Sequence, residues 1–130
     1  MPFPYAEINK ERFPLVFISF TGEPSTDENF LDYLNGMKDL YSRKKDLSII
    51  FDARKATLPS LRHQKMQAKW LEENRDDLKT HCRGTAYVIT KIAVRSILKM
   101  IFSITPQPVP YKIVSNMEDA ENWCTEKLAQ

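Results

Sequence analysis

Short apolar runs alternate along this chain with longer segments in which apolar residues recur every three or four positions. The apolar runs span residues 13–20, 47–53, 85–90 and 111–114. Each run is typical of a strand, and each segment between them is typical of an amphipathic helix. Strands that are joined through helices run parallel in one sheet, with right-handed crossovers. The alternation therefore predicts an α/β fold.

A further strand precedes this series. Residues 5–8 and 13–20 are extended runs joined by the polar residues 9–12, which predicts a hairpin whose first strand is antiparallel to the second. The expected order is ββαβαβαβα, a mixed but mostly parallel sheet of about five strands with about four helices. The most apolar positions of the strands should be buried: Phe17, Ile18, Ile50, Phe51, Val88 and Ile113.

Capping signals mark where the expected helices begin and end. Ser25 and Glu28 fit a capping box at the start of a helix over residues 26–45, which ends in the cations of residues 43–45. A second helix is expected over about residues 60–80 and a third over residues 92–104. Prolines from Pro106 onward end the third helix, and Asn116 is a good N-cap for a fourth.

Length and composition narrow the class of protein. A chain of 130 residues fits a single domain over residues 1–130, and a hydrophobic content of 42% is enough for a packed core. A net charge of +2 is too small to indicate nucleic-acid binding. Cys82 and Cys124 form no CxxC pair, and the sequence contains no signal peptide and no long apolar stretch. We therefore expect a cytoplasmic protein with reduced thiols and no transmembrane segment.

Motifs that carry catalysis or nucleotide binding are missing from the sequence. The glycines, Gly22, Gly36 and Gly84, are too far apart for a phosphate-binding loop or a nucleophile elbow. His63 and His81 would lie roughly 27 Å apart on one helix, so they cannot share a metal, and we expect both to face solvent. The sequence thus predicts a protein that is not an enzyme and that needs no metal and no cofactor.

Cations concentrate in one region of the sequence. Residues 54–71 hold five of them and no acid: Arg54, Lys55, Arg62, Lys65 and Lys69. The last three share one face of the expected second helix, whose N-terminus adds positive potential. This basic cluster is a candidate site for a phosphorylated small molecule, a phosphorylated partner or a lipid headgroup. The alternative is a solvated basic face that is balanced by the acids of residues 72–77.

Asp52 is a candidate of a different kind, because it ends a buried strand. Open α/β sheets place their ligand sites at the carboxyl ends of the strands, so a functional role for this carboxylate is one interpretation. The other interpretation is an aspartate that hydrogen-bonds the following loop or caps the next helix. The sequence alone leaves both open.

The third expected helix carries more apolar residues than one core-facing stripe requires. Met100, Ile101 and Ile104 lie toward the flank of its core face, which makes them candidates for a homodimer contact or for the lid of an apolar pocket. The alternative is a helix wedged deep between the sheet and its neighbours. A helix of this length with internal cations cannot span a bilayer.

The order of elements resembles the SpoIIAA-like fold that STAS domains share with anti-sigma-factor antagonists. The segment LSIIFD at residues 47–52 is similar to the family's central strand, and VSNMEDAENWC at residues 114–124 is similar to its closing segment. In the antagonists, a partner kinase phosphorylates a serine at the start of the second helix. Ser60 is the nearest hydroxyl in this sequence, although the acid and glycine that accompany that serine are absent. The chain also resembles uncharacterised bacterial proteins described as STAS/Sec14-like, which implies no activity.

These observations leave alternative functions open. The resemblance implies a noncatalytic protein-interaction or regulatory module that acts through a protein partner or a homodimer. The alternative is a small lipid or apolar-anion binding protein. In that case the third helix covers a cavity, and the basic cluster at the start of the second helix holds a headgroup. A third interpretation is an enzyme whose motif is not recognisable.

Overall fold

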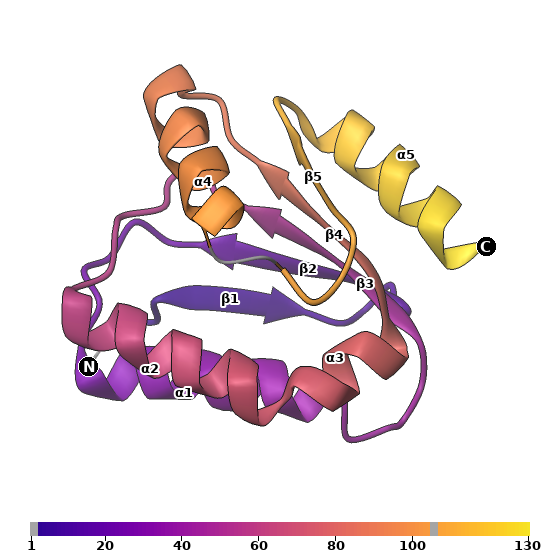
Figure 1. The fold of residues 1–130 in the computed structure, drawn as a ribbon, viewed down its shortest axis with the longest axis horizontal. Helices are drawn as coiled ribbons and strands as arrows, with labels where there is room; N and C mark the ends of the chain where they lie inside the picture. The colour runs from indigo at the N-terminus through magenta and orange to yellow at the C-terminus, as the bar shows by residue number, and fades with distance from the viewer. Residues whose placement is uncertain (1–2, 105–106) are drawn as a thin grey trace.

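The alternation of strands and helices that the sequence predicts is present in the computed structural model of the chain (Figure 1). The structure describes residues 3–104 and 107–130, except for the side chains of Ile97, Ile101 and Ile104. The strands are β1 (Ala6–Asn9), β2 (Leu15–Phe20), β3 (Leu47–Asp52), β4 (Cys82–Val88) and β5 (Tyr111–Val114). The helices are α1 (Asp27–Leu40), α2 (Leu61–Glu73), α3 (Arg75–His81), α4 (Ile92–Ile104) and α5 (Met117–Leu128).

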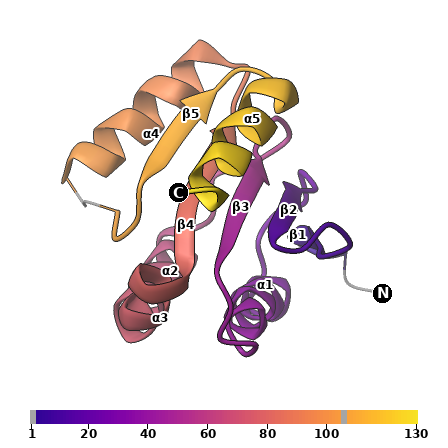
Figure 2. The ribbon, with the colours of Figure 1, turned by 90° about the vertical axis from the view of Figure 1, so that its right-hand side faces the viewer.

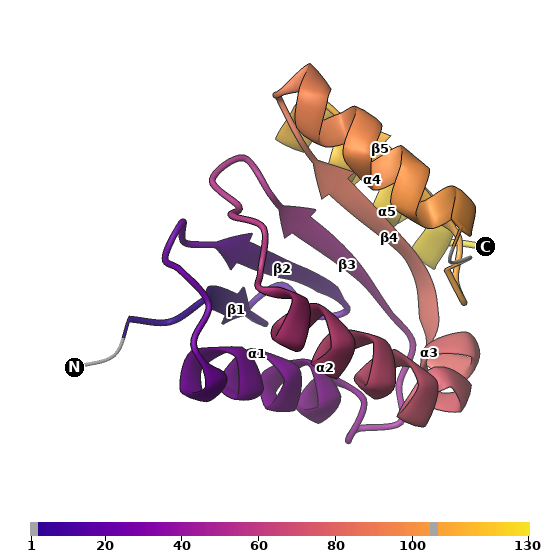
Figure 3. The same cartoon turned by 60° about the vertical axis from the view of Figure 1, so that its left-hand side comes forward.

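The strands form a single mixed sheet in the order β1-β2-β3-β4-β5. β1 pairs with β2 in antiparallel orientation, and the other neighbours are parallel, so the predicted α/β architecture is confirmed. Because β2, β3 and β4 are parallel, the loops that follow them leave one edge of the sheet, called here the carboxyl edge. Figure 3 shows these loops on the side of the arrowheads.

Each face of the sheet is covered by its own set of helices. Val16, Ile18 and Ile49 pack beneath α1, whereas Ile50 and Val88 pack on the other face beneath α5. Successive residues of a strand point to opposite faces, so β2, β3 and β4 need apolar residues at nearly every position. Figure 2 shows α5 on one side of the sheet and α1, α2, α3 and α4 on the other.

The predicted strand core is confirmed in part. Ile18, Ile50, Phe51 and Val88 are buried as expected. The prediction is wrong for Phe17 and Ile113, which are only partly buried. Ile113 lies on β5, an edge strand that pairs on one side only. Phe17 lies on the face of α5, but that helix covers β3, β4 and β5 rather than β2, and the guanidinium of Arg12 lies 5.0 Å from the ring instead.

The first helix begins and ends at residues other than those predicted. Its N-cap is Thr26 rather than Ser25: the Thr26 hydroxyl accepts the Asn29 N–H, and the Asn29 side chain accepts the Thr26 N–H. The predicted box with Glu28 is therefore wrong by one residue. The helix ends at Leu40, and Lys44 takes a left-handed conformation with φ of 54°, so the cations of residues 43–45 follow the helix instead of forming its last turn.

The predicted helix over residues 60–80 is two helices, so the structure describes five helices rather than about four. The break falls at Asn74, whose backbone leaves helical geometry with φ of −110° and ψ of 13°. Its side-chain amide donates to the Trp70 carbonyl oxygen at 2.9 Å. Short polar side chains compete for backbone groups in this way, which ends α2 and lets α3 start in a new direction.

Candidate ligand-binding site

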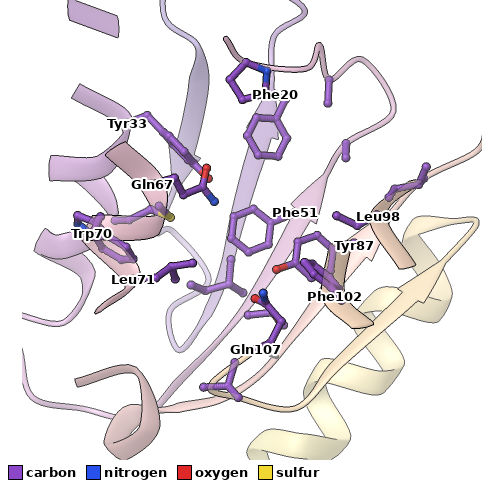
Figure 4. A pocket seen from close by; sticks show the side chains of 18 of the residues that line it. Phe20, Tyr33, Phe51, Gln67, Trp70, Leu71, Tyr87, Leu98, Phe102 and Gln107 are labelled. Atoms are coloured by element: carbon purple, nitrogen blue, oxygen red, sulfur yellow. The ribbon is translucent and has the colours of Figure 1, made fainter. Parts of the chain in front are cut away.

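A cavity of about 320 Å³ lies over the sheet between α2 and α4 (Figure 4). Its walls come from helices that are separated in sequence by β4, and its floor comes from the strands beneath them. None of the described residues that line it is Asp, Glu, Lys, Arg or His. The cavity is therefore an uncharged and mostly apolar space.

The floor of the cavity is aromatic. Phe20, Phe51 and Tyr87 come from β2, β3 and β4 and point to the same face of the sheet. The ring centroids of Phe20 and Phe51 lie 6.0 Å apart with an interplanar angle of 13°, and those of Phe51 and Tyr87 lie 5.0 Å apart with an angle of 7°. Cross-strand pairing fixes this spacing, because Phe51 and Tyr87 are register partners.

The walls of the cavity are built by three helices. Tyr33 projects from α1, and Trp70 and Leu71 project from α2. From α4, the helix opposite, Leu98 and Phe102 complete the wall. The Phe102 ring also lies 5.3 Å from the Tyr87 ring and 4.7 Å from the Tyr111 ring, which fixes α4 against the sheet.

The polar groups that reach the cavity are neutral hydrogen-bonding groups. Figure 4 shows the side-chain amides of Gln67 and Gln107 and the hydroxyl of Tyr87 pointing toward its centre. Burial raises the pKa of Tyr87, so its hydroxyl stays protonated and can donate a hydrogen bond. The Thr85 hydroxyl, on the same face of β4, is buried near the Tyr87 hydroxyl, but no contact of hydrogen-bond geometry joins it to a described residue. A water molecule or a ligand in the cavity can supply a partner for this hydroxyl.

The mouth of the cavity lies at the carboxyl edge of the sheet. Most lining residues are buried or half-buried, and the exposed ones are Thr57, Leu58 and Val94. The first two belong to the loop after β3, and Val94 belongs to the first turn of α4, which follows β4. The cavity therefore opens between the loop of residues 53–60 and the start of α4.

Asp52, the predicted strand-end candidate, is engaged with the loop that follows it. Its carboxylate accepts hydrogen bonds from the Arg54 backbone N–H at 3.2 Å, from Arg54 Nε at 2.8 Å and from Arg54 Nη2 at 2.7 Å. The Arg54 guanidinium lowers the pKa of the Asp52 carboxyl below its usual range. Both residues, with Glu7 and Lys55, border a second hollow of about 600 Å³ that shares Phe20 with the cavity. This geometry fits the interpretation in which Asp52 hydrogen-bonds the loop that follows it.

The structure divides the basic cluster into paired and unpaired cations. Arg54 is bound to Asp52, and Arg62 donates to Asp27 Oδ1 at 3.0 Å. Lys55, Lys65 and Lys69 are exposed, and none forms an ion pair with a carboxylate of the described part of the chain. The anion site stays a prediction, and its free charges are the lysines rather than the arginines.

The prediction that both histidines face solvent is wrong. His63 is 5% exposed and stacks on Phe30, with ring centroids 5.2 Å apart. Its Nδ1 lies 2.7 Å from Ser25 Oγ and its Nε2 lies 2.8 Å from Asp27 Oδ1. His81 is partly buried, with Nδ1 3.4 Å from Asp46. His63 is buried because its position on α2 faces α1. Its contacts with Ser25, Asp27 and Phe30 link the start of α2 to the start of α1.

The order Ser25, His63, Asp27 matches the hydrogen-bond order of a serine hydrolase, but the surroundings do not fit that chemistry. Asp27 is 64% exposed on its side chain and also binds Arg62, and Ser25 Oγ accepts the Ser60 N–H at 3.5 Å. None of the three residues lines the cavity. In the described residues, no group of three or more His, Cys, Asp or Glu side chains is arranged to hold a metal. We assign these contacts to the joining of two helices.

The remaining sequence candidates have other positions. Ser60 is exposed, and its hydroxyl caps α2 by accepting the His63 N–H at 3.3 Å. Met100 is 57% exposed and does not line the cavity. The side chains of Ile101 and Ile104 lie outside the described part of the structure. The alternative of a deeply wedged α4 is wrong, since Ile92 and Met100 are largely exposed.

The cavity residues themselves were not singled out from the sequence. Phe20 and Tyr87 read there as ordinary strand residues, and Gln67 and Trp70 as part of a helix with few apolar positions. The sequence does carry two signals of the cavity: few apolar positions along residues 61–73, and an excess of apolar residues along residues 92–104. Helix α2 has few apolar residues to bury, and α4 has more than its contact with the sheet needs. This combination is expected when two helices do not pack against each other and leave a cavity between them.

Comparison with known proteins supports the fold alone. No family model matches the chain, and no curated protein matches it. Among solved structures, the chain is similar to an uncharacterised protein of the DUF3478 family with a SpoIIAA-like fold from Shewanella loihica PV-4. The TM-score is 0.68 at 13% identity, over 92% of this chain and 91% of that chain. The predicted SpoIIAA-like fold is therefore confirmed. No described helix is long and apolar enough to cross a membrane.

Proposed function

We propose that this SpoIIAA-like domain is a noncatalytic protein that binds a small, mostly apolar molecule in the cavity between α2 and α4. The observation that carries the proposal is the cavity itself, uncharged and floored by three aromatic rings. Its volume of about 320 Å³ falls within the range of small-molecule sites, roughly 300–1,000 Å³. Such sites combine apolar walls with a few well-placed polar groups, and this cavity has that composition.

The polar groups indicate which ligands fit. The amides of Gln67 and Gln107 can donate and accept, and the Tyr87 hydroxyl donates. A ligand with an apolar body and a carbonyl, hydroxyl or ether oxygen would meet these groups near the centre of the cavity. It could also supply the partner that the buried Thr85 hydroxyl lacks, which offsets a desolvation cost of about 1–3 kcal/mol.

A formal charge does not fit inside the cavity. No described lining residue is ionisable near neutral pH, and moving an unpaired charge out of water costs far more than the cavity can return. An anionic ligand would keep its charged end at the mouth, where Lys55 belongs to the same loop as Thr57 and Leu58. This arrangement corresponds to the alternative function that the sequence predicts, a small lipid-binding protein, with the lipid headgroup at the loop before α2.

A neutral fluorescent probe tests the site. N-phenyl-1-naphthylamine should bind the protein saturably at one site, with an increase in emission. Leu98→Trp places a larger side chain in the cavity from α4 and should weaken binding at least about ten-fold, because the overpacked wall must shift to admit the probe. Met100→Trp is the matched control, since it makes the same kind of change on the exposed face of the same helix and should leave affinity unchanged.

The outcomes separate the candidate functions. Thermal unfolding first establishes that both variants are folded. If Leu98→Trp bound the probe as tightly as the parent, the cavity would not be the binding site. If the parent bound no probe, the protein-interaction module implied by the family resemblance would be the better account.

A further inference from the structure

Three aliphatic side chains at the carboxyl edge are almost fully exposed. Leu58 and Leu61 are each 74% exposed, and Ile92 is 77% exposed. The first two flank the start of α2 after β3, and Ile92 opens α4 after β4. Since β3 and β4 are parallel neighbours, the three residues come from the two segments that border the cavity mouth.

The same two segments are basic. Residues 53–71 and 89–104 contain no Asp or Glu. Within them, Lys55, Lys65 and Lys91 are exposed, and no carboxylate of the described residues forms an ion pair with them. Of the acids near this edge, Asp27 and Asp52 are bound to Arg62 and Arg54. Glu23 and Glu28 belong to the segment after β2, and neither forms an ion pair within the described residues. The two segments that border the mouth therefore present aliphatic side chains together with lysines that are unpaired among the described residues.

Single exposed leucines are ordinary on protein surfaces, so exposure alone would mean little. The presence of lysines next to these aliphatic side chains limits the kinds of partner that fit this surface. Protein–protein interfaces are enriched in aromatic residues and arginine and depleted in lysine. A lysine beside an aliphatic side chain suits a bilayer, where the aliphatic group enters the acyl boundary and the ammonium stays among the headgroups.

We propose that the carboxyl edge docks on an anionic lipid bilayer. Leu58, Leu61 and Ile92 enter the interface, and Lys55, Lys65 and Lys91 meet the anionic headgroups. The cavity mouth then faces the bilayer, so an apolar ligand passes between membrane and cavity with little exposure to water. The docking goes beyond the proposed ligand binding and does not depend on it, because the surface is present whether or not the cavity is filled.

Flotation with lipid vesicles tests the docking. The parent protein should float with vesicles of roughly equal amounts of phosphatidylcholine and phosphatidylglycerol, and binding to phosphatidylcholine alone should be at least about ten-fold weaker. Added salt should weaken the binding, because it screens the lysines.

Two variants separate the contributions. Leu61→Gln with Ile92→Gln removes aliphatic side chains that do not line the cavity, and should reduce vesicle binding at least about ten-fold. The triple variant Lys55→Gln, Lys65→Gln, Lys91→Gln should reduce it by on the order of 100-fold on anionic vesicles. Met100→Gln and Lys38→Gln are matched controls. Met100 is exposed farther along α4, and Lys38 lies in the last turn of α1, so neither change should alter binding.

Each result decides the proposal. Selective loss in the edge variants, with the controls unchanged, supports docking through the carboxyl edge. Absence of binding to anionic vesicles, or equal loss in the control variants, overturns it and leaves a protein partner for this surface. Probe binding in the absence of vesicles reports on the cavity alone, so failure of the docking and failure of the ligand site are distinguishable.

Discussion

Tyr87 projects from the sheet, contacts α4 and lines the cavity. Its ring packs between Phe51 and Phe102, and its hydroxyl points into the cavity. Burial raises the pKa of this hydroxyl above its ordinary value, so the hydroxyl is neutral at physiological pH. One residue thus contributes both packing and a hydrogen-bond donor, and the two contributions can be separated.

Tyr87→Phe keeps the ring and removes the donor. We expect the free energy of unfolding to change by less than about 1.5 kcal/mol, since a typical hydrogen bond contributes about that much at most. Affinity for an apolar probe should be unchanged, whereas affinity for a ligand with a carbonyl or hydroxyl oxygen should fall by roughly 3–10-fold. Titrations of both ligand types with both proteins give the comparison. Equal losses for the two types would contradict a donor role for Tyr87.

The contacts of Asp27 should make the free energy of unfolding depend on pH. Hydrogen bonds from His63, and then from Arg62, lower the pKa of its carboxyl below the ordinary value of 3.8. A lowered folded-state pKa gives stability that is present above 3.8 and lost as the pH falls through the folded value. The difference in urea midpoint between the parent and Asp27→Asn should therefore shrink as the pH falls below about 4. A difference that grew as the pH fell would contradict this assignment.

Single residues also show what sequence patterns could not reveal. The exposure of His63 could not be predicted, because its burial depends on α1 lying against α2, which no local pattern encodes. The pairing of Asp52 with Arg54 could have been predicted from the sequence, because an aspartate commonly accepts a hydrogen bond from the backbone N–H two residues later in a loop. The pairing of Arg62 with Asp27 was not, because the two residues come from different helices.

Among the elements, α5 is held closest to the sheet. Gly84 of β4 lies directly beneath Trp123 of α5: a Cβ built at Gly84 would lie 2.9 Å from two carbons of the indole ring. The absence of a side chain at this position lets the helix approach β4. The close fit accounts for a glycine in the middle of a buried strand, where it would otherwise weaken the sheet.

Gly84→Ala should lower the free energy of unfolding by about 1–3 kcal/mol, because the Trp123 ring and with it α5 must shift. Gly36→Ala is the matched control. Its Cβ would meet only the end of the flexible Ile8 side chain, and alanine in a helix interior is favoured over glycine by about 1 kcal/mol. Urea unfolding of the three proteins should place Gly36→Ala at or above the parent and Gly84→Ala below it. The reverse order would mean that α5 does not rest on Gly84.

The existence and type of the elements could be predicted better than their ends. Apolar runs and helical periodicity report on burial, which the fold enforces along whole elements. The ends depend on single hydrogen bonds, such as those of Thr26 with Asn29 and of Asn74 with Trp70. Several hydroxyl, amide and carboxyl side chains near each end can make such bonds, so the sequence offers more than one cap.

For the molecule as a whole, the order of elements determined the architecture but not the cavity. Right-handed crossovers between parallel strands place α1, α2 with α3, and α4 on one face of the sheet. The other apolar face is left for α5, which follows the last strand. The cavity depends on how far α2 and α4 stand apart across β3 and β4. That distance follows from the packing of bulky residues such as Trp70 and Phe102, which periodicity does not measure.

The measurement that tests the central claim most directly is native mass spectrometry of protein purified from cells without detergent, before and after organic extraction. We expect the parent and Met100→Trp to carry an additional small mass that extraction removes, and Leu98→Trp to carry much less of it, because its larger side chain occupies the cavity. The bare mass of the chain in all three proteins, together with no uptake of an apolar probe, would contradict the claim that this domain binds a small apolar molecule.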